Sequence, residues 1–298
     1  MKFLFNARIG IEDWCFRTGP PHALAILRIT LGLYLLIYWG LMFPNITELF
    51  SVDGLVLPFA NSAVLTAPPV WLAYLLFSLF FLSLLLFTIG ALFQIASATV
   101  FVFYSYYWML SLHLLGGPLD LFVILILFIL TFSGADRVYS FSIWKEYGSL
   151  NEWEAINVFP QRLIAIQIAV IYLGVGLQKL FLPAWKSGEI LYYSFIGNRG
   201  TPVAYLLTRI FPITFFKWIL IFTKAFEILL PFGLWIKSIR KWFFIGGAIL
   251  HLFFAITLGL WWLIAILPAY ILFLTPEDAE EFCEAKLENL FSKLKKNS

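Results

Sequence analysis

Residues 70–112 read VWLAYLLFSLFFLSLLLFTIGALFQIASATVFVFYSYYWMLSL and contain no Asp, Glu, Lys or Arg. An α-helix needs about 20 mostly apolar residues to cross the hydrocarbon core of a bilayer. The stretch is long enough for two such helices, and Gly90 marks the joint between them, which predicts spans at 70–89 and 92–112. This pair of helices indicates a helical protein embedded in a membrane.

Six further apolar stretches of suitable length lie on either side of this pair. The sequence therefore predicts an all-α polytopic membrane protein with about eight transmembrane helices. The other six are expected at 22–42, 119–134, 161–180, 214–236, 242–257 and 260–274. Gly259 joins the last two as closely as Gly90 joins the second and third, so short or broken helices are expected at both joints.

The composition of the whole chain agrees with a bilayer as its solvent. Of the 298 residues, 62% are hydrophobic and only 12% are charged, about half the charged share of a typical soluble domain. This excludes a soluble globular enzyme and a disordered chain. The net charge of +3 is too small and too scattered to attract polyanions, which excludes nucleic acid as a partner.

The two ends of the chain are more polar than the middle. Residues 1–21 are interrupted by charges and do not form a signal peptide, so we expect a cytoplasmic N-terminal segment. Residues 22–274 form the membrane domain. Residues 275–298 begin with Thr275-Pro276, a helix-start signal, and predict a cytoplasmic amphipathic helix, either resting on the membrane or solvated. Cys15 and Cys283 match no metal or redox spacing, so no metal site is expected.

Positive charges in the connecting segments predict the orientation. With the N-terminus inside, thirteen of the 20 lysines and arginines fall on the inner side and five on the outer side. Cytoplasmic loops carry the excess of Lys and Arg, so we expect both termini inside a plasma (inner) membrane. The aromatic and charged residues of outer loop 183–213 and inner loop 136–160 predict interfacial helices in both.

Two sets of ionisable residues fall within or beside the predicted spans. An ionisable side chain is costly in a membrane, so each of these residues is expected to be paired or to have a function. Arg28 and Glu227 lie at similar depths from the inner side, and Lys224 precedes Glu227 by three residues on one helix face. We expect these three residues to form a buried cluster that fixes helix packing. A proton path or a lipid head-group site is the functional alternative for the same cluster.

The second set lies near the outer surface and comes from several segments. Its members are His113, Asp120, Lys179, Glu189 and His251. A lysine that is partly desolvated in an apolar pocket acts as a base more readily than one in water. The structural alternatives are a lysine that snorkels to the head groups and histidines that only support packing.

Around Lys179 the sequence resembles a known family. Residues 172–180, YLGVGLQKL, and 184–188, AWKSG, are similar to the signature of the horizontally transferred transmembrane (HTTM) domain. The residues around Arg28, the stretch GADR at 134–137 and the helix around His251 also resemble that domain, in the same order. The HTTM domain is the membrane part of the vitamin K-dependent gamma-glutamyl carboxylases.

The resemblance implies a site. In the carboxylases a lysine at the place of Lys179 is the base that deprotonates vitamin K hydroquinone, and a histidine at the place of His113 assists it. We expect His251 to assist as well, by hydrogen bonding or proton transfer. A quinone of the vitamin K or menaquinone type is the implied cofactor, and a secreted peptide is a possible partner. The residues expected to contact substrate are Tyr172, Trp185, Gly188, Glu189 and Asp120.

Two departures from the carboxylases leave alternatives open. The large soluble C-terminal region of those enzymes has no counterpart in this sequence, and the inner loop has Ser140-Phe141-Ser142 where the family often has Ser-x-Asp. Short bacterial members include proteins that mature secreted toxin peptides of the sporulation-delaying type. The leading hypothesis is therefore an HTTM-type enzyme that acts on a quinone or an exported peptide. The alternatives are a non-enzymatic scaffold in a peptide maturation or redox complex, and a lipid or small-solute transporter.

Overall fold

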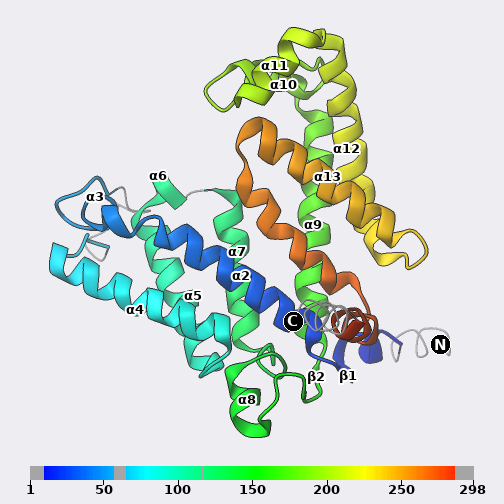
Figure 1. Ribbon diagram of the computed structural model, residues 1–298. Coiled ribbons are helices and arrows are strands. Elements are labelled where there is room, and N and C mark those ends of the chain that lie inside the picture. Colours follow the sequence, from blue (N-terminus) through cyan, green and yellow to red (C-terminus); the bar gives the residue numbers. More distant parts are fainter. Residues whose placement is uncertain (1–9, 57–64, 116, 286–298) are drawn as a thin grey trace, which may run out of the picture. The chain divides into compact units, whose positions relative to one another are not determined.

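The computed structural model describes residues 10–56, 65–115 and 117–285, and most of these are helical (Figure 1). The chain divides into two compact units. The first comprises residues 1–162 and 275–298, and the second residues 163–274. The boundary falls inside helix α9 (Phe159–Phe181), whose first turn belongs to the first unit.

The helices of the first unit follow the predicted spans closely. The prediction of 70–89 is confirmed to the residue by α4 (Val70–Ile89), and Gly90 ends this helix with a positive φ of 69°. The other elements of this unit are α2 (His22–Gly40), η1 (Phe43–Asn45), α3 (Ile46–Phe50), α5 (Phe93–Leu110), α6 (Leu112–Leu115), α7 (Pro118–Thr131) and α8 (Phe141–Tyr147). Strand β1 (Thr18–Gly19) pairs antiparallel with β2 (Ile156–Asn157), a small departure from the expected all-α fold.

An aromatic cluster forms the core of the first unit. The Trp39 side chain of α2 is fully buried, and its ring lies 4.8 Å from that of Phe80 and 5.3 Å from those of Tyr104 and Tyr107. Helices α2, α4 and α5 thus meet through large rings, which bury much apolar area at each contact. Tyr104 and Tyr107 are both only 1% exposed and belong to this core.

The second unit is a smaller helical assembly. Its elements are α9 beyond Arg162, η2 (Pro183–Trp185), α10 (Glu189–Ile196), α11 (Pro202–Ile210), α12 (Ile213–Trp235), α13 (Arg240–Leu258) and the 3₁₀ helix η3 (Trp261–Phe273). Short helices were expected within 183–213, and α10 and α11 supply them. They pack on the first half of α12 through Leu191, Phe195, Phe216 and Leu220.

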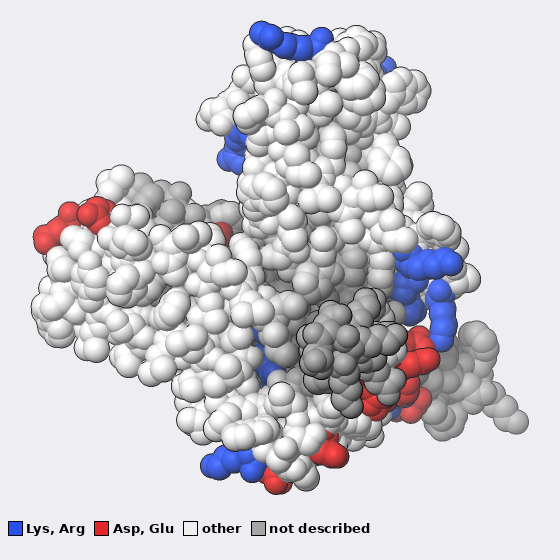
Figure 2. Space-filling model, viewed as in Figure 1, with Lys and Arg blue, Asp and Glu red and all other residues white. Residues whose placement is uncertain are grey.

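Within residues 10–56, 65–115 and 117–285, four helices are long and apolar enough to cross a membrane, namely α2, α4, α9 and α13. A fifth candidate arises if η3 and the following helix Pro276–Ala285 are counted together as one broken span. Figure 2 shows that charged side chains gather near the ends of α8, the α10–α11 tip and the α12–α13 turn. The sides of the helices in view carry almost no charged side chains. Apolar sides and charged ends are what a lipid environment requires. The protein is therefore an integral membrane protein, while eight spans and their orientation stay predictions.

Candidate functional site

One face of α9 carries the site. Tyr172, Gly176 and Lys179 follow one another at spacings of four and three residues, so they share a side of the helix. Gly176 is buried, and a Cβ atom there would lie 2.8 Å from Cγ1 of Ile228 and 3.2 Å from Cβ of Glu227. The missing side chain at Gly176 lets α12 approach α9 closely, and this approach brings Glu227 to Lys179.

Lys179 and Glu227 form a largely buried ion pair. Nζ of Lys179 donates to both carboxylate oxygens of Glu227, at 2.5 and 2.6 Å. The Lys179 side chain is 14% exposed and that of Glu227 is 11% exposed. Charge-assisted hydrogen bonds of this length are among the strong ones in proteins, and each charge offsets the desolvation of the other.

Trp185 lies directly against this pair. Nζ of Lys179 is 4.7 Å from the centre of the Trp185 ring, a cation–π distance. The backbone carbonyl of Trp185 accepts a hydrogen bond of 2.9 Å from Nζ of Lys224. The resemblance named Lys179 and Trp185 as neighbours in one site, and the geometry brings them together.

This arrangement corrects the predicted partners of Glu227. The sequence predicts a cluster of Glu227 with Arg28 and Lys224, whereas in the structure the Glu227 carboxylate pairs with Lys179. Lys224 is on the same helix as Glu227 but extends to the Trp185 carbonyl. A lysine on a facing helix can point its ammonium straight at the carboxylate, and a lysine three residues away on the same helix gains less from such a pair.

Arg28 has a different role inside the first unit. Its guanidinium is fully buried and donates to the carbonyls of Ala135 at 2.8 Å and of Tyr139 at 2.6 Å. Gly90 makes room for it, because a Cβ there would lie 2.6 Å from Nη1 of Arg28. Burial raises the pKa of the nearby Asp136 carboxyl, and Arg137 and Arg28 partly oppose that rise. Arg28 thus fastens the loop that follows α7 through its backbone carbonyls.

The second unit also contains a group of three aromatic side chains that are joined by hydrogen bonds. The Tyr172 hydroxyl lies 2.5 Å from Nε2 of His251 and 2.8 Å from the hydroxyl of Tyr270. His251 is 5% exposed and Tyr270 is 3% exposed. Tyr172 and His251 were predicted site residues, but Tyr270 was missed. No pattern in the sequence points to Tyr270; in the structure Gly247 makes room for it, because a Cβ there would lie 2.7 Å from the Tyr270 hydroxyl oxygen.

The remaining predicted residues are placed as follows. Asp120 accepts hydrogen bonds from the Tyr104 hydroxyl at 2.8 Å and from the Gly117 amide at 3.2 Å, which is a helix-capping role. Gly188 has a φ of 88° and precedes α10, and the exposed Glu189 is the first residue of that helix. The side chain of His113 lies outside the described residues.

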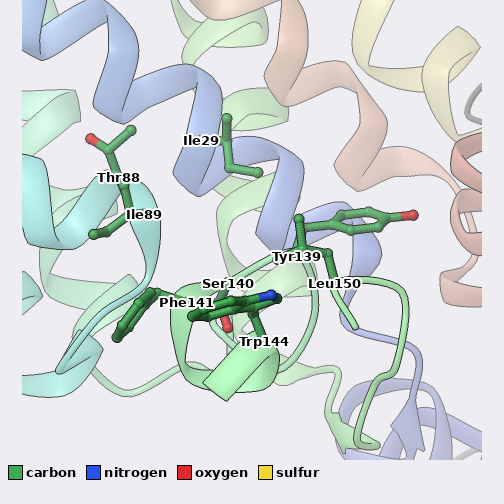
Figure 3. Close-up of a pocket in the computed structure, with 8 residues that line it drawn as sticks. All are labelled: Ile29, Thr88, Ile89, Tyr139, Ser140, Phe141, Trp144 and Leu150. Atoms are coloured by element: carbon green, nitrogen blue, oxygen red, sulfur yellow. The ribbon is translucent and has the colours of Figure 1, made fainter. Parts of the chain in front are cut away.

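An apolar hollow of about 480 Å³ lies in the first unit. Figure 3 shows it between the end of α4, α2 and the α8 region. Its lining is Ile29, Thr88, Ile89, Tyr139, Ser140, Phe141, Trp144 and Leu150. None of the predicted site residues lines it, so size alone does not mark the hollow as the site.

A comparison with protein families identifies the family of the chain. The model of the HTTM domain matches residues 16–277, which is most of the chain. The chain belongs to the HTTM domain family. No curated protein and no solved structure is significantly similar to it. The match includes α9, α12, η2 and α13, so the ion pair and the Tyr172–His251–Tyr270 group lie within the HTTM domain.

Proposed function

We propose that this HTTM protein is a multi-pass enzyme of the plasma membrane with Lys179 as its general base. Its substrate is a quinone of the vitamin K or menaquinone type, an exported peptide, or both, bound at the extracytoplasmic face. The observation that carries this proposal is the buried Lys179–Glu227 ion pair beside Trp185. Ionisable groups within apolar helices are costly and are typical of functional positions.

The pair supplies a way for a lysine to become a base. In the ion pair the amine is protonated, so it must first release a proton, and Glu227 lies at hydrogen-bond distance to accept it. That transfer leaves a neutral amine and a neutral carboxyl group, and burial favours neutral forms over charged ones. The amine can then take the proton of a hydroquinone hydroxyl, which yields the hydroquinone anion and the Lys179 ammonium.

Other residues have supporting roles in this proposal. Tyr172 lies on the same face of α9 as Lys179, and its hydroxyl is hydrogen-bonded to His251. These groups would hold the substrate oxygen or pass protons to it. His113 remains the second proposed helper. The proposed substrate contacts are Trp185, Gly188, Glu189 and Asp120, of which Asp120 already has two partners within the first unit.

The test uses the full chain in lipid nanodiscs with vitamin K hydroquinone as the probe. The wild type should oxidise the hydroquinone in air, and Lys179→Met should lower the rate roughly 100-fold or more, the usual size of a lost general base. Lys186→Met is the matched control, because this exposed lysine follows Trp185 and should keep the full rate. Mass spectrometry of the purified protein should also show a co-purified quinone.

A double variant separates catalysis from folding. Lys179→Met or Glu227→Gln alone changes one partner of a buried ion pair, which costs about 3–5 kcal/mol when the other charge is left unpaired. Lys179→Met with Glu227→Gln removes both charges and should recover most of the stability without the activity. Wild-type turnover by that double variant would show that the base lies elsewhere.

The same ion pair also favours a second candidate function. Lys179 and Glu227 satisfy each other, so the pair could serve only to fix α9 against α12 in a non-enzymatic scaffold. A scaffold would show no hydroquinone oxidation by the wild type, and the single variants would affect stability alone. A lipid or small-solute transporter has no specific observation in its favour.

A further inference from the structure

The first unit contains a group of three possible metal ligands that the sequence analysis missed. His22 is the first residue of α2, and Glu280 and Glu284 lie on the helix Pro276–Ala285. One ligand atom of each residue lies within 4.8 Å of those of the other two. His22 and Glu280 lie 258 positions apart in the sequence, which hides this group from any search for ligand spacing.

The C-terminal helix is held in place by contacts on several sides. The Thr275 hydroxyl caps it by accepting from the Asp278 amide, and Arg17 donates to both oxygens of Glu277 at 2.7 and 2.9 Å. Ala279 and Cys283 are buried. Glu280 follows Ala279, and Glu284 follows Cys283. One position along an α-helix is a rotation of about 100°, so both glutamates lie at the border of the packed face.

The three ligands differ in exposure in a way that suits a bound ion. His22 is only 1% exposed, Glu280 is half-buried and Glu284 is exposed. The site therefore has an inner imidazole and an outer carboxylate that solvent can reach. An ion could enter from the Glu284 side without opening the packing around His22.

His22 gives independent support for a ligand. Its Nδ1 atom is buried and has no hydrogen-bond partner in the part of the chain that the structure describes. The ring packs edge-on against Tyr139 at 5.4 Å and Trp153 at 6.0 Å, which orients the ring without giving Nδ1 a hydrogen bond. Buried polar atoms are normally paired, and a buried imidazole beside two carboxylates is explained if a metal ion is its partner.

We propose that His22, Glu280 and Glu284 bind one divalent transition-metal ion, which joins the C-terminal helix to the start of α2. The two carboxylates balance the charge of the ion, and an imidazole nitrogen suits Zn²⁺, Mn²⁺ or Fe²⁺ better than Mg²⁺ or Ca²⁺. Trp153 forms a side-chain hydrogen bond with Glu280, an outer contact of the kind that orients metal ligands. Three protein ligands leave at least one position for water.

This inference does not depend on the proposed enzyme activity. Glu280 and Glu284 lie beyond residue 277, where the match to the HTTM domain ends, so the site is a feature of this chain rather than of the matched domain. It concerns how the C-terminal helix is attached, and it can hold or fail whether or not Lys179 is a base.

Zn²⁺ binding to the full-length protein tests the proposal. The protein is purified in detergent without a histidine tag, treated with a chelator and dialysed against micromolar Zn²⁺, and metal content is measured by mass spectrometry. The wild type should bind one ion per chain and gain thermal stability from it. Glu280→Gln and Glu284→Gln should each weaken binding at least tenfold and lose that gain.

Glu281→Gln is the matched control. Glu281 lies on the same helix and is exposed, and its substitution removes one negative charge from outside the group. It should bind Zn²⁺ as the wild type does. Equal binding by all four proteins would overturn the proposal, as would a wild type that binds no Zn²⁺, Mn²⁺ or Fe²⁺. In the latter case His22 is a packing residue that shares protons with the two carboxylates.

Discussion

At the scale of single residues, the sequence identified the important charges but not their partners. Lys179 was placed at the outer end of its span and Glu227 nearer the inner end of its own, because depth was counted from span ends. The count assumes that all helices begin and end in the same planes. In the structure the first half of α12 packs against α10 and α11 through Phe216 and Leu220, and the part of α12 around Glu227 and Ile228 lies against Gly176 of α9. That offset brings Glu227 level with Lys179.

Gly90 is a residue whose two roles can be separated by experiment. Its φ of 69° favours glycine, and a Cβ there would lie 2.6 Å from both Nη1 of Arg28 and Cβ of Ser140. Gly148 has a similar φ of 70° but open space around it. Alanine at either position costs about 1–2 kcal/mol for the left-handed backbone, and overpacking costs a further 1–3 kcal/mol or so at Gly90.

We therefore expect Gly90→Ala to lower the unfolding temperature in detergent clearly more than Gly148→Ala. The additional loss at Gly90 reflects displacement of Arg28 from the Ala135 and Tyr139 carbonyls. Equal losses in the two variants would mean that the backbone conformation alone accounts for Gly90 and that Arg28 adjusts freely.

At the scale of elements, apolar length predicted helices well and helix type less well. The predicted spans 161–180, 214–236 and 242–257 correspond to α9, α12 and α13 within two residues at each end. The last predicted span, 260–274, is instead the 3₁₀ helix η3, with Pro268 inside it. Its 13 residues rise about 26 Å at roughly 2.0 Å per residue, so it is nearly as long as an α-helical span. Hydrophobicity predicts the length of this segment but does not distinguish a 3₁₀ helix from an α-helix.

Two glycines of α9 give an element-scale prediction about how this helix meets α12. A Cβ atom added at Gly174 would have nothing within 4 Å, whereas one added at Gly176 would lie 2.8 Å from Ile228. Gly174→Ala should stabilise the protein by about 0.5–1 kcal/mol, since alanine favours the helix. Gly176→Ala should destabilise it by about 1–3 kcal/mol through overpacking.

Thermal unfolding of the two variants in the same detergent measures this difference. Gly176→Ala should also weaken hydroquinone oxidation, because it pushes Glu227 away from Lys179, while Gly174→Ala should not. A Gly176→Ala protein as stable and as active as Gly174→Ala would show that α9 and α12 do not need this close approach.

At the scale of the whole molecule, composition and the resemblance were sufficient to predict a helical HTTM protein of the membrane. They could not predict the division into two units, because it falls inside α9, where no change of composition marks a boundary. Nor could they place the C-terminal helix, whose contact with Arg17 joins residues 260 positions apart. Local patterns specify helices, whereas contacts between distant segments depend on how the side chains pack.

The orientation of the chain in the membrane is the prediction that concerns the whole molecule. Helix α9 has 23 residues and is about 34 Å long at 1.5 Å per residue, enough to cross a hydrocarbon core of about 30 Å. Asn151 precedes it and Ser187 follows it, and both are exposed. The excess of Lys and Arg on the predicted inner side places Asn151 in the cytoplasm and Ser187 outside.

Cysteine labelling in intact bacterial cells measures this directly, in a background with Cys15→Ser and Cys283→Ala. A membrane-impermeant maleimide should label Ser187→Cys in intact cells and Asn151→Cys only after permeabilisation. The reverse pattern would invert the orientation and place Lys179 near the cytoplasmic face, which contradicts a substrate site on the outer side. Labelling of both positions in intact cells would show that α9 does not cross the membrane, because a single crossing must put its two ends on opposite sides.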